Sequence, residues 1–259
     1  ESTLHRSISF IMGFAQDSAA AQPTKIESII IPTVSAGNVS QLAADLLIEN
    51  LSATRIGYLE HDGLLPMVGQ LKRNNGSDEL VTSADVYYVE SQSLVIVQQR
   101  APVAKAQRAS FQNMLMEWIK SSTCTRVIIL AGMNAFERVE SQLHGSQLRS
   151  LTSENMSSAQ DMLTQHGCPR LETRTPTAVV PDGLFVHGGG MCRTLFHNLC
   201  ATSLETVALL RFCMPGDTRF EAMQLASTLS NWLQLTDTQT GPTGLPKGWA
   251  VPLSWEKCY

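Results

Sequence analysis

The sequence has no excess of positive charge and no long hydrophobic run. Its 19 Lys and Arg residues are outnumbered by 23 Asp and Glu residues, which gives a net charge of −4 at pH 7. General nucleic-acid binders and proteins held on anionic membranes carry basic stripes, so neither class is expected here. No apolar segment approaches the roughly 20 residues that a membrane-spanning helix needs. We therefore expect no nucleic acid and no membrane among the partners.

Glycine, proline and cysteine are too few or too scattered to define an unusual architecture. The 259 residues include 17 glycines and 11 prolines, which excludes collagen-like and proline-rich chains. Six cysteines are irregularly spaced and form no C-x-x-C pair, so we predict reduced, mostly buried thiols. With 43% hydrophobic and 16% charged residues, the composition is that of an ordinary globular protein. A chain of this length can bury a sizeable core without cross-links.

The first clearly predicted unit is a strand followed by a turn and a helix. Residues 28–31 form a short β-branched run typical of a buried strand, and Pro32 ends its regular pairing. Gly37 and Asn38 lie in the turn that follows, where we assign them a structural role, with Asn38 as the helix N-cap. Apolar residues at helical spacing over 39–47 predict a helix with one buried face.

The rest of the chain alternates between strand and helix patterns. A strand over 55–59 is expected to return beside the first strand, which makes a parallel βαβ unit. The further expected elements are a loop at 74–77, a hairpin of strands over 81–90 and 94–99, a helix over 107–120, a strand over 126–130, a short helix near 153–165, a strand over 184–186, a helix from the triple glycine to about 200, and helices over 204–213 and 220–235. This pattern predicts an α/β fold, namely a three-layer α/β/α sandwich with a mixed, mainly parallel sheet and a helical C-terminal part.

The chain divides into three expected parts. Residues 1–25 are polar and aperiodic, which predicts a flexible N-terminal tail. Residues 26–235 form a single α/β domain, in which 133–182 has the weakest periodicity. Residues 236–259 are predicted to be a linker and a C-terminal tail that packs on or near the domain, because Pro, Gly and Thr give way there to two tryptophans.

A His-Gly-Gly-Gly string over 187–190 is the most specific catalytic motif. Esterases use such a string as an oxyanion hole ahead of a G-x-S-x-G nucleophile elbow, and no such elbow occurs in this sequence. We therefore favour a structural turn at Gly188, Gly189 and Gly190, with a phosphorylase- or esterase-like hydrolase that uses this loop as the alternative. The same glycines beside Arg193 could hold an anion at a helix start, although G-x-G-x-x-G and Walker patterns are absent.

Two other groups of reactive residues give weaker signals. His197 and Cys200 are three residues apart on one predicted helix, with Cys192 before them, and this trio is the candidate metal site. Without a paired C-x-x-C, buried thiols on a helix face explain the trio better. His61 and Asp62 are adjacent in a turn-like segment, which favours loop polar groups over a catalytic dyad. We expect no catalytic residue, no metal and no cofactor.

Several segments spread over residues 26–255 match a known family. They are IPTVSAGNVSQLAADLL over 31–47, IGYL over 56–59, LPMVG over 65–69, the glycines at 188–190, ALLRF over 208–212 and NWL over 231–233. Together they resemble the proteasome assembly chaperone 2 family, and the first block is the most specific. The resemblance implies a fold like that of the nucleoside phosphorylases without their catalysis.

The resemblance also implies a function and partners. Such a protein is a non-enzymatic chaperone that pairs with a related first subunit, binds proteasome α subunits, promotes assembly of the α ring and prevents premature α-ring dimerisation. We expect it in the cytoplasm and the nucleus. Members of such heterodimers can end in a hydrophobic–tyrosine–any motif that inserts between α subunits. This chain ends in Cys258 and Tyr259, with the tyrosine last.

The candidate partner-binding residues follow from these expectations. An obligate partner needs a large apolar surface. Leu204, Val207 and Leu210 lie on a predicted helix that is apolar almost all round. Cys258 and Tyr259, at the tail, complete the set. Burial of 204–213 in the core, a tail supplied by the partner instead, and a plain structural homodimer remain open alternatives.

Overall fold

The fold is built on an eight-stranded sheet and a separate two-stranded hairpin. A computed structural model describes residues 13–17, 20, 23–236, 241 and 244–255. The strands are β1 (Phe14–Gln16), β2 (Ser28–Pro32), β3 (Thr54–Leu59), β4 (Val68–Lys72), β5 (Asp78–Thr82), β6 (Ala84–Val89), β7 (Leu94–Gln99), β8 (Arg126–Asn134), β9 (Leu148–Thr152) and β10 (Glu205–Cys213). The α-helices are α1 (Val39–Asn50), α2 (Arg108–Ser121), α3 (Ser157–Gln165), α4 (Cys192–Cys200) and α5 (Arg219–Leu233).

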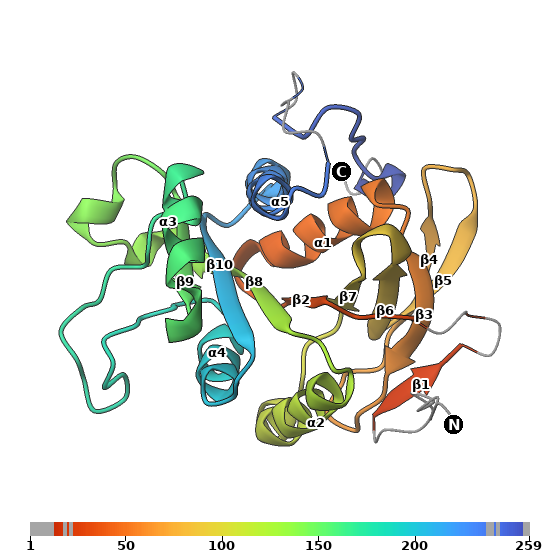
Figure 1. The fold of residues 1–259 in the computed structure, drawn as a ribbon, viewed down its shortest axis with the longest axis horizontal. Helices are drawn as coiled ribbons and strands as arrows, with labels where there is room; N and C mark the ends of the chain where they lie inside the picture. The colour runs from red at the N-terminus through yellow and green to blue at the C-terminus, as the bar shows by residue number, and fades with distance from the viewer. Residues whose placement is uncertain (1–12, 18–19, 21–22, 237–240, 242–243, 256–259) are drawn as a thin grey trace, which may run out of the picture.

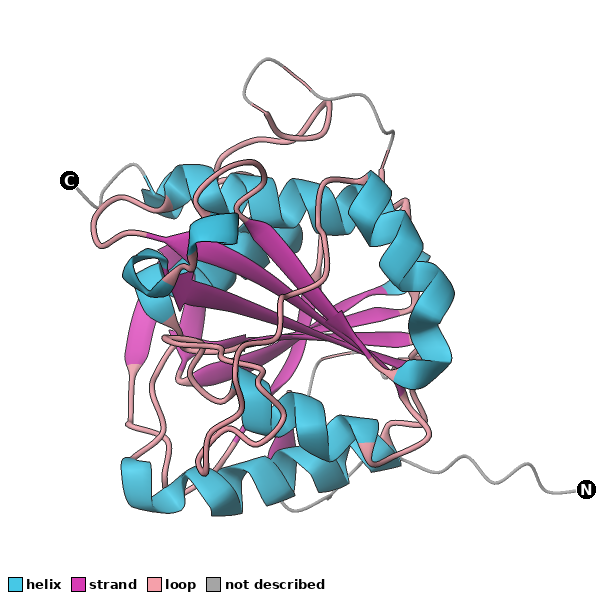
Figure 2. Ribbon diagram, turned by 90° about the vertical axis from the view of Figure 1, so that its left-hand side faces the viewer, coloured by secondary structure: helices cyan, strands magenta, loops and turns pink. Residues whose placement is uncertain are grey.

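The large sheet has a parallel centre and antiparallel flanks. Its order is β1-β3-β6-β7-β2-β8-β10-β9, and β7, β2, β8 and β10 are successive parallel neighbours. Helices α1 and α5 cover one face and α2 and α4 cover the other (Figures 1 and 2). The predicted α/β/α sandwich with a mixed sheet is therefore confirmed. In the described residues, no helix has the length and apolarity needed to cross a bilayer.

Burial on both faces explains why the central strands are apolar throughout. Ile29 and Ile31 pack into the core below the sheet, with α2 and α4, whereas Ile30 packs into the core above it, with α1 and α5. Strands buried on both faces have continuous rather than alternating hydrophobic runs. The five described cysteines are unpaired, and all but Cys200 are buried, as expected for thiols used as small hydrophobic groups.

The βαβ prediction at the start of the domain is wrong in its pairing. Strand β3 forms where expected, but β6 and β7 lie between it and β2, and β3 pairs antiparallel with β6 and with β1. The predicted hairpin, realised as β6 and β7, takes the place beside β2 because all of its strand residues are buried. The loop at 74–77 is the turn of a further hairpin, β4–β5, which the sequence pattern does not predict.

The predicted helix over 204–213 is wrong: these residues form strand β10. A continuous apolar run does not distinguish a buried strand from a buried helix by periodicity. Here the run pairs with β8 on one side and β9 on the other, so a strand satisfies its backbone. Among the described residues, the C-terminal part therefore contains the α-helices α4 and α5, with strand β10 between them.

Three short elements also differ from expectation. Residues 14–16, which lie in the predicted flexible tail, form β1 and join the sheet edge, in a run too short to show periodicity. Strand β9 is not predicted because the buried Arg149 interrupts its apolar pattern. Residues 184–186 form no strand and instead pack as an irregular segment against the lower core.

Candidate functional site

The loops at the carboxyl ends of β2 and β8 lie where doubly wound folds bind ligands. After β2 the chain turns back over one face through α1, whereas β8 is reached over the opposite face through α2, and the connection from β8 to β10 passes through β9 and α3 before it returns through α4 on that opposite face. Such a change in direction opens a crevice at the carboxyl edge of the sheet, and ligands of open α/β sheets bind there. The triple glycine of residues 188–190 enters this edge.

In this chain the crevice is closed by backbone-to-backbone contacts. The Ala36 N–H donates to the Gly188 carbonyl at 2.8 Å, and the Asn134 N–H donates to the His187 carbonyl at 2.8 Å. The Thr33 hydroxyl adds a contact of 3.1 Å to the Gly189 carbonyl. These amides are donors that an anion or an oxyanion would otherwise use. The loop therefore satisfies them internally, and the hydrolase interpretation is not favoured.

Glycine is required where these loops touch. Gly190 has a φ of +60°, and a Cβ built on it would lie 2.1 Å from the Val34 carbonyl oxygen. A Cβ on Gly132 would lie 2.1 Å from the Ala36 carbonyl oxygen. Gly188 also has a positive φ, of +82°. The string that resembles an oxyanion hole thus allows close packing of three loops.

The turn before α1 is held by serines rather than by an asparagine cap. Asn38 is the N-cap residue of α1, as predicted, but it adopts a left-handed conformation with φ 52° and its side chain makes no capping hydrogen bond. Instead, Gly132 N–H donates to Ser35 Oγ at 2.8 Å, and Ser40 Oγ donates to the Thr33 carbonyl at 2.6 Å. Ser35 Oγ and Ser40 Oγ are 3.0 Å apart, which links the two bonds into one chain. The serines fix the loop to β8.

His61 is not arranged as a general base. Its Nδ1 accepts a hydrogen bond of 2.9 Å from the Gly63 N–H, so in the neutral ring Nε2 carries the proton. Nε2 lies 3.1 Å from Ser110 Oγ and donates to it. A histidine that activates a serine must accept the hydroxyl proton instead. His61 therefore positions a loop, which is the role that its turn-like sequence context favours over a dyad with Asp62.

The candidate metal ligands Cys192, His197 and Cys200 do not form a metal site, because the thiols are protonated and the histidine has another partner. Burial raises the pKa of Cys192 to about 12, and that of Cys200 to about 11, so both thiols stay protonated near neutral pH. His197 Nε2 lies 2.7 Å from Asp182 Oδ2. Within the part of the chain that the structure describes, no three His, Cys, Asp or Glu side chains converge on a point that could hold a metal.

Asp182 also forms an ion pair with Arg193, the arginine of the candidate anion site. Arg193 Nη2 lies 2.8 Å from Asp182 Oδ1, so this guanidinium is already paired. Burial by itself would raise the pKa of Asp182, but hydrogen bonds from Arg193 and from the Leu184 N–H, with the charges of Arg193 and His197, lower it overall. The contacts of Asp182 with Arg193 and His197 hold the segment before the glycine loop against α4.

The predicted partner residues are not brought together. Val207 and Leu210 have no exposed surface, because they face the upper and lower cores from β10, so neither can contact a partner. Leu204 is half-buried against the lower core. Cys258 and Tyr259 lie outside the described residues, so their role stays a prediction.

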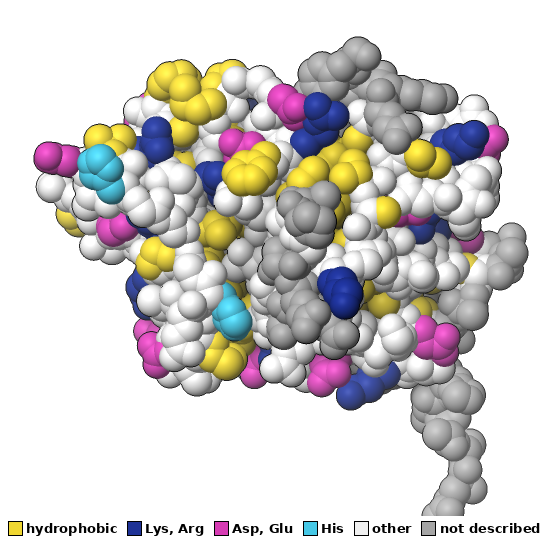
Figure 3. Space-filling view, turned by 90° about the horizontal axis from the view of Figure 1, so that it is seen from above, with side chains coloured by type: hydrophobic (Ala, Val, Ile, Leu, Met, Phe, Trp, Pro, Cys, Tyr) yellow, Lys and Arg dark blue, Asp and Glu magenta, His cyan; other side chains and the backbone are white. Residues whose placement is uncertain are grey.

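Among the described residues, two groups of exposed apolar side chains lie elsewhere in the structure. One group lies on or beside the β4–β5 hairpin and comprises Leu65, Met67, Val68 and Leu80. The other follows the carboxyl ends of β8 and β10 and comprises Phe136, Met214 and Phe220. Neither is evident from the sequence, because single exposed hydrophobics carry no periodic signal. On the face that carries α1 and α5, the visible hydrophobic side chains gather in separate groups with charged side chains between them (Figure 3).

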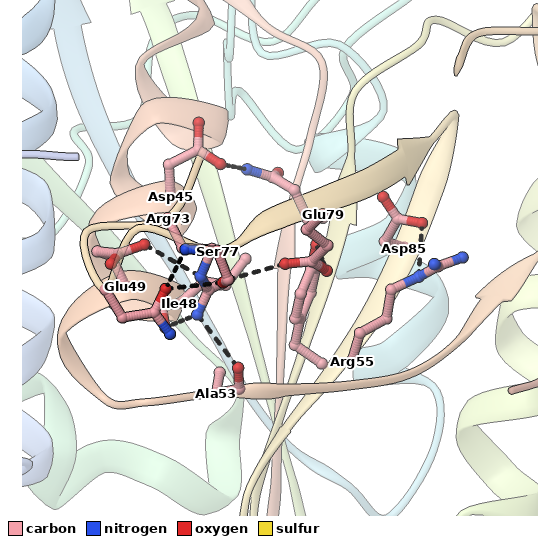
Figure 4. Close-up of polar contacts among 12 residues, drawn as sticks. Asp45, Ile48, Glu49, Ala53, Arg55, Arg73, Ser77, Glu79 and Asp85 are labelled. Carbon is pink, nitrogen blue, oxygen red and sulfur yellow. Dashed lines mark hydrogen bonds and ion pairs between the residues drawn. The ribbon is translucent and has the colours of Figure 1, made fainter. Parts of the chain in front are cut away.

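A buried arginine ties the hairpin to α1 (Figure 4). Arg73 Nε lies 3.1 Å from Glu49 Oε2, and its Nη1 lies 3.4 Å from Glu79 Oε2. Its Nη2 donates to the carbonyls of Ile48 and Ala53 at 3.2 and 3.3 Å. A buried charge is tolerated only with such complete pairing. The network fixes the hairpin against the end of α1.

A C-terminal strap, residues 249–255, crosses the domain beside the hairpin. Asn50 binds both backbone groups of Ala250, with Nδ2–O and N–Oδ1 distances of 2.9 and 2.7 Å. Asn74, in the hairpin turn, donates to the Val251 carbonyl at 3.2 Å and accepts from the Leu253 N–H at 2.8 Å. The side-chain amides of Asn50 and Asn74 make the backbone hydrogen bonds that a neighbouring strand would otherwise make. They fix the position of the last described residues of the strap.

Taken together, these features define a doubly wound α/β domain whose ligand crevice is filled by its own backbone. The PAC2 family model matches residues 29–233. Proteasome assembly chaperone 2 of Homo sapiens is 34% identical over 240 residues, which cover 90% of this chain and 91% of that protein. Proteasome assembly chaperone 2 of Nematostella vectensis is 36% identical over 223 residues, covering 82% and 91%. The chain belongs to the PAC2 family.

Two solved structures share the fold. PbaB of Pyrococcus furiosus, described as an archaeal proteasome activator, superposes with a TM-score of 0.64 over 87% of this chain and 91% of its own. PbaA of the same organism, described as an archaeal homolog of proteasome-assembly chaperone, superposes with a TM-score of 0.62 over 85% and 87%. Both are 17% identical to this chain, so they establish the shared architecture.

Proposed function

We propose that this chain is a non-enzymatic chaperone of proteasome assembly. The observation that carries the proposal is its identity of about one third, over 90% of its length, with proteins named proteasome assembly chaperone 2. The closed crevice agrees with this function, because the backbone donors at the switch point are already bonded to carbonyls of the glycine loop. Exposed apolar side chains on a rigid scaffold suit protein binding rather than turnover.

The proposal includes the partners and the place of action. The chain pairs with a related first chaperone subunit, and the heterodimer binds proteasome α subunits, promotes assembly of the α ring and prevents premature α-ring dimerisation. It acts in the cytoplasm and the nucleus. Its C-terminal residues Cys258 and Tyr259 take part in binding an α subunit.

Co-purification tests this function directly. The tagged full chain is isolated from its own cells, and intact complexes are weighed by mass spectrometry. We expect an equimolar complex with a second chain of the same fold that carries proteasome α subunits. A lone monomer or a symmetric homodimer without α subunits would contradict the proposal. Deletion of residues 257–259 is expected to weaken α-subunit binding while the pairing with the first subunit persists.

A further inference from the structure

The outer face of the β4–β5 hairpin carries an apolar patch of Val68 and Leu80 among polar residues, with Thr82 opposite Val68 and Gln70 opposite Leu80. Val68 and Leu80 are 68% and 61% exposed. The pairing of Val68 with Thr82 places Val68 and Leu80 on the same face, because Leu80 is two residues from Thr82. Val81 and Glu79 point to the other face, where Val81 is buried and Glu79 binds Arg73. Leu65 and Met67, just before β4, extend the apolar surface.

This surface is held rigidly although a two-stranded ribbon is marginally stable alone. Arg73 anchors the turn end of the ribbon to α1 and to the residues that follow it. At the other end, Ser83 Oγ donates to the Leu65 carbonyl at 2.8 Å and accepts from the Met67 N–H at 2.9 Å. A surface fixed in advance loses little conformational entropy when a partner binds.

An acidic groove borders the same end of the hairpin. The groove has a volume of about 470 Å³ and is lined by Tyr58, Leu59, Glu60, His61, Asp62, Leu64, Pro66, Met67, Thr82 and Ser83. No Lys or Arg lines it, and among the described residues neither Glu60 nor Asp62 makes an ion pair. Its only nitrogen base, His61, is held by Gly63 and Ser110. The groove therefore attracts a cationic side chain next to the apolar face.

The mixed apolar and acidic chemistry of this surface suits a releasable contact. Obligate subunit interfaces are large and more hydrophobic, whereas transient interfaces are small and mix apolar with charged groups. An assembly chaperone must release the subunit that it delivers. The surface also adjoins the strap, since the turn Leu253–Trp255 (η7) packs against β4 and Asn74 binds Leu253. A partner that meets the strap can therefore reach the hairpin as well.

We propose that the hairpin face docks a proteasome α subunit through a segment in which an apolar side chain lies beside a Lys or Arg. The apolar side chain packs on Val68 and Leu80, and the cation enters the groove at Glu60 and Asp62. This inference rests on the proposed function, and it adds the surface and the chemistry of the bound segment.

Site-specific photocrosslinking tests the surface. A benzoylphenylalanine replaces Leu80 in the full chain, which is co-expressed with the first chaperone subunit and the α subunits. The control carries the same group at Val179, which is 83% exposed in a loop far along the chain. We expect crosslinks from position 80 to an α-subunit peptide that contains Lys or Arg near an apolar residue, and none from position 179. Crosslinks from position 80 only to the first chaperone subunit, or to peptides without a basic residue, would overturn the inference.

Charge removal tests the groove. The variant E60Q/D62N is compared with E140Q/D161N, which neutralises two exposed carboxylates elsewhere. In the purified heterodimer, we expect E60Q/D62N to weaken α-subunit binding about 3–10-fold at low salt and to lose most of the salt dependence. The control variant should bind as the unmodified chain does. Equal affinity of all three proteins, with intact complexes, would overturn the groove assignment, whereas absence of any complex would overturn the proposed function itself.

Discussion

The Ala36 N–H donates a 2.8 Å hydrogen bond to the Gly188 carbonyl oxygen, so the loop after β2 and the segment before α4 form one interlocked unit. In doubly wound enzymes this edge holds a substrate or cofactor. Here the chain places its own peptide groups there, and the donors that would recognise an anion bind carbonyl oxygens. The fold thereby has the stability of a closed edge and leaves its outer surfaces for protein contacts.

Gly190→Ala should destabilise this unit strongly. The added Cβ would lie 2.1 Å from the Val34 carbonyl, and the residue has a φ of +60°. We expect a loss of about 2–4 kcal/mol in the free energy of unfolding, measured by urea denaturation. Gly167→Ala is the control, because Gly167 has a φ of +75° and an added Cβ would meet nothing within 4 Å, and it should lose only about 1 kcal/mol. Equal losses would mean that the loops do not depend on their close approach.

Arg73→Met should loosen the hairpin. The change leaves the carboxylates of Glu49 and Glu79, which are 11% and 20% exposed, without their shared cation. We expect a loss of about 3 kcal/mol in unfolding free energy, because an uncompensated buried charge is costly. The triple variant R73M/E49Q/E79Q removes the stranded charges and should recover part of this loss. A single variant as stable as the unmodified chain would show that the network does not hold the hairpin.

Asn74→Ala should release the strap without unfolding the domain. It removes the hydrogen bonds to Val251 and Leu253, each worth about 1 kcal/mol. Hydrogen exchange followed by mass spectrometry should then become faster in residues 249–255 and stay unchanged in the central strands. Asn113→Ala, at an exposed position on α2, serves as the control and should leave exchange in the strap unchanged. Uniform acceleration across the chain would contradict a local clamp.

Acid should destabilise the domain through Asp182 and Glu172. Burial by itself raises the pKa of the Glu172 carboxyl, but hydrogen bonds from Arg149 and Gln142 lower it overall, and the pKa of Asp182 is likewise lowered, against the effect of burial, by Arg193. A depressed pKa in the folded state means that the unfolded chain binds protons first as the pH falls. Stability is therefore present at neutral pH and is lost between about pH 5 and the folded-state pKa values.

The doubly substituted E172Q/D182N chain tests this assignment. It should be less stable at pH 7 and should lose less unfolding free energy than the unmodified chain when the pH falls to about 3. D161N, which neutralises an exposed carboxylate, should keep the full pH dependence. An unchanged pH dependence in E172Q/D182N would mean that other carboxylates control acid unfolding.

Local sequence patterns are sufficient for the helices and for several strands. Helices α1, α2 and α5 form close to their expected bounds because each has apolar residues at helical spacing. Strand β10 does not follow its prediction, because a strand buried between two neighbours shows the same continuous apolar run as a buried helix. Strand β9 is not recognisable in the sequence because Arg149 interrupts its apolar run. Arg149 is buried in an ion pair with Glu172, which lies further along the chain.

The candidate site likewise combines features that the sequence predicts with contacts that it does not predict. The glycines at 37 and 188–190 are recognisable as turn residues, since glycine before a helical pattern is typical of a turn. What they touch is not recognisable, because Gly190 meets Val34 and Gly132 meets Ala36 only after the sheet has formed. The hairpin face and the acidic groove likewise depend on long-range contacts made by Arg73 and Ser83.

By itself, the sequence determined the fold class, the positions of the amphipathic helices and the family to which the chain belongs, because these follow from local periodicity and from short distinctive blocks of residues. Only the tertiary structure decided the order of the strands, the closing of the crevice and the identity of the exposed apolar faces. Those properties depend on which distant backbone groups and side chains satisfy one another, and a buried polar group accepts whichever partner the complete fold brings to it.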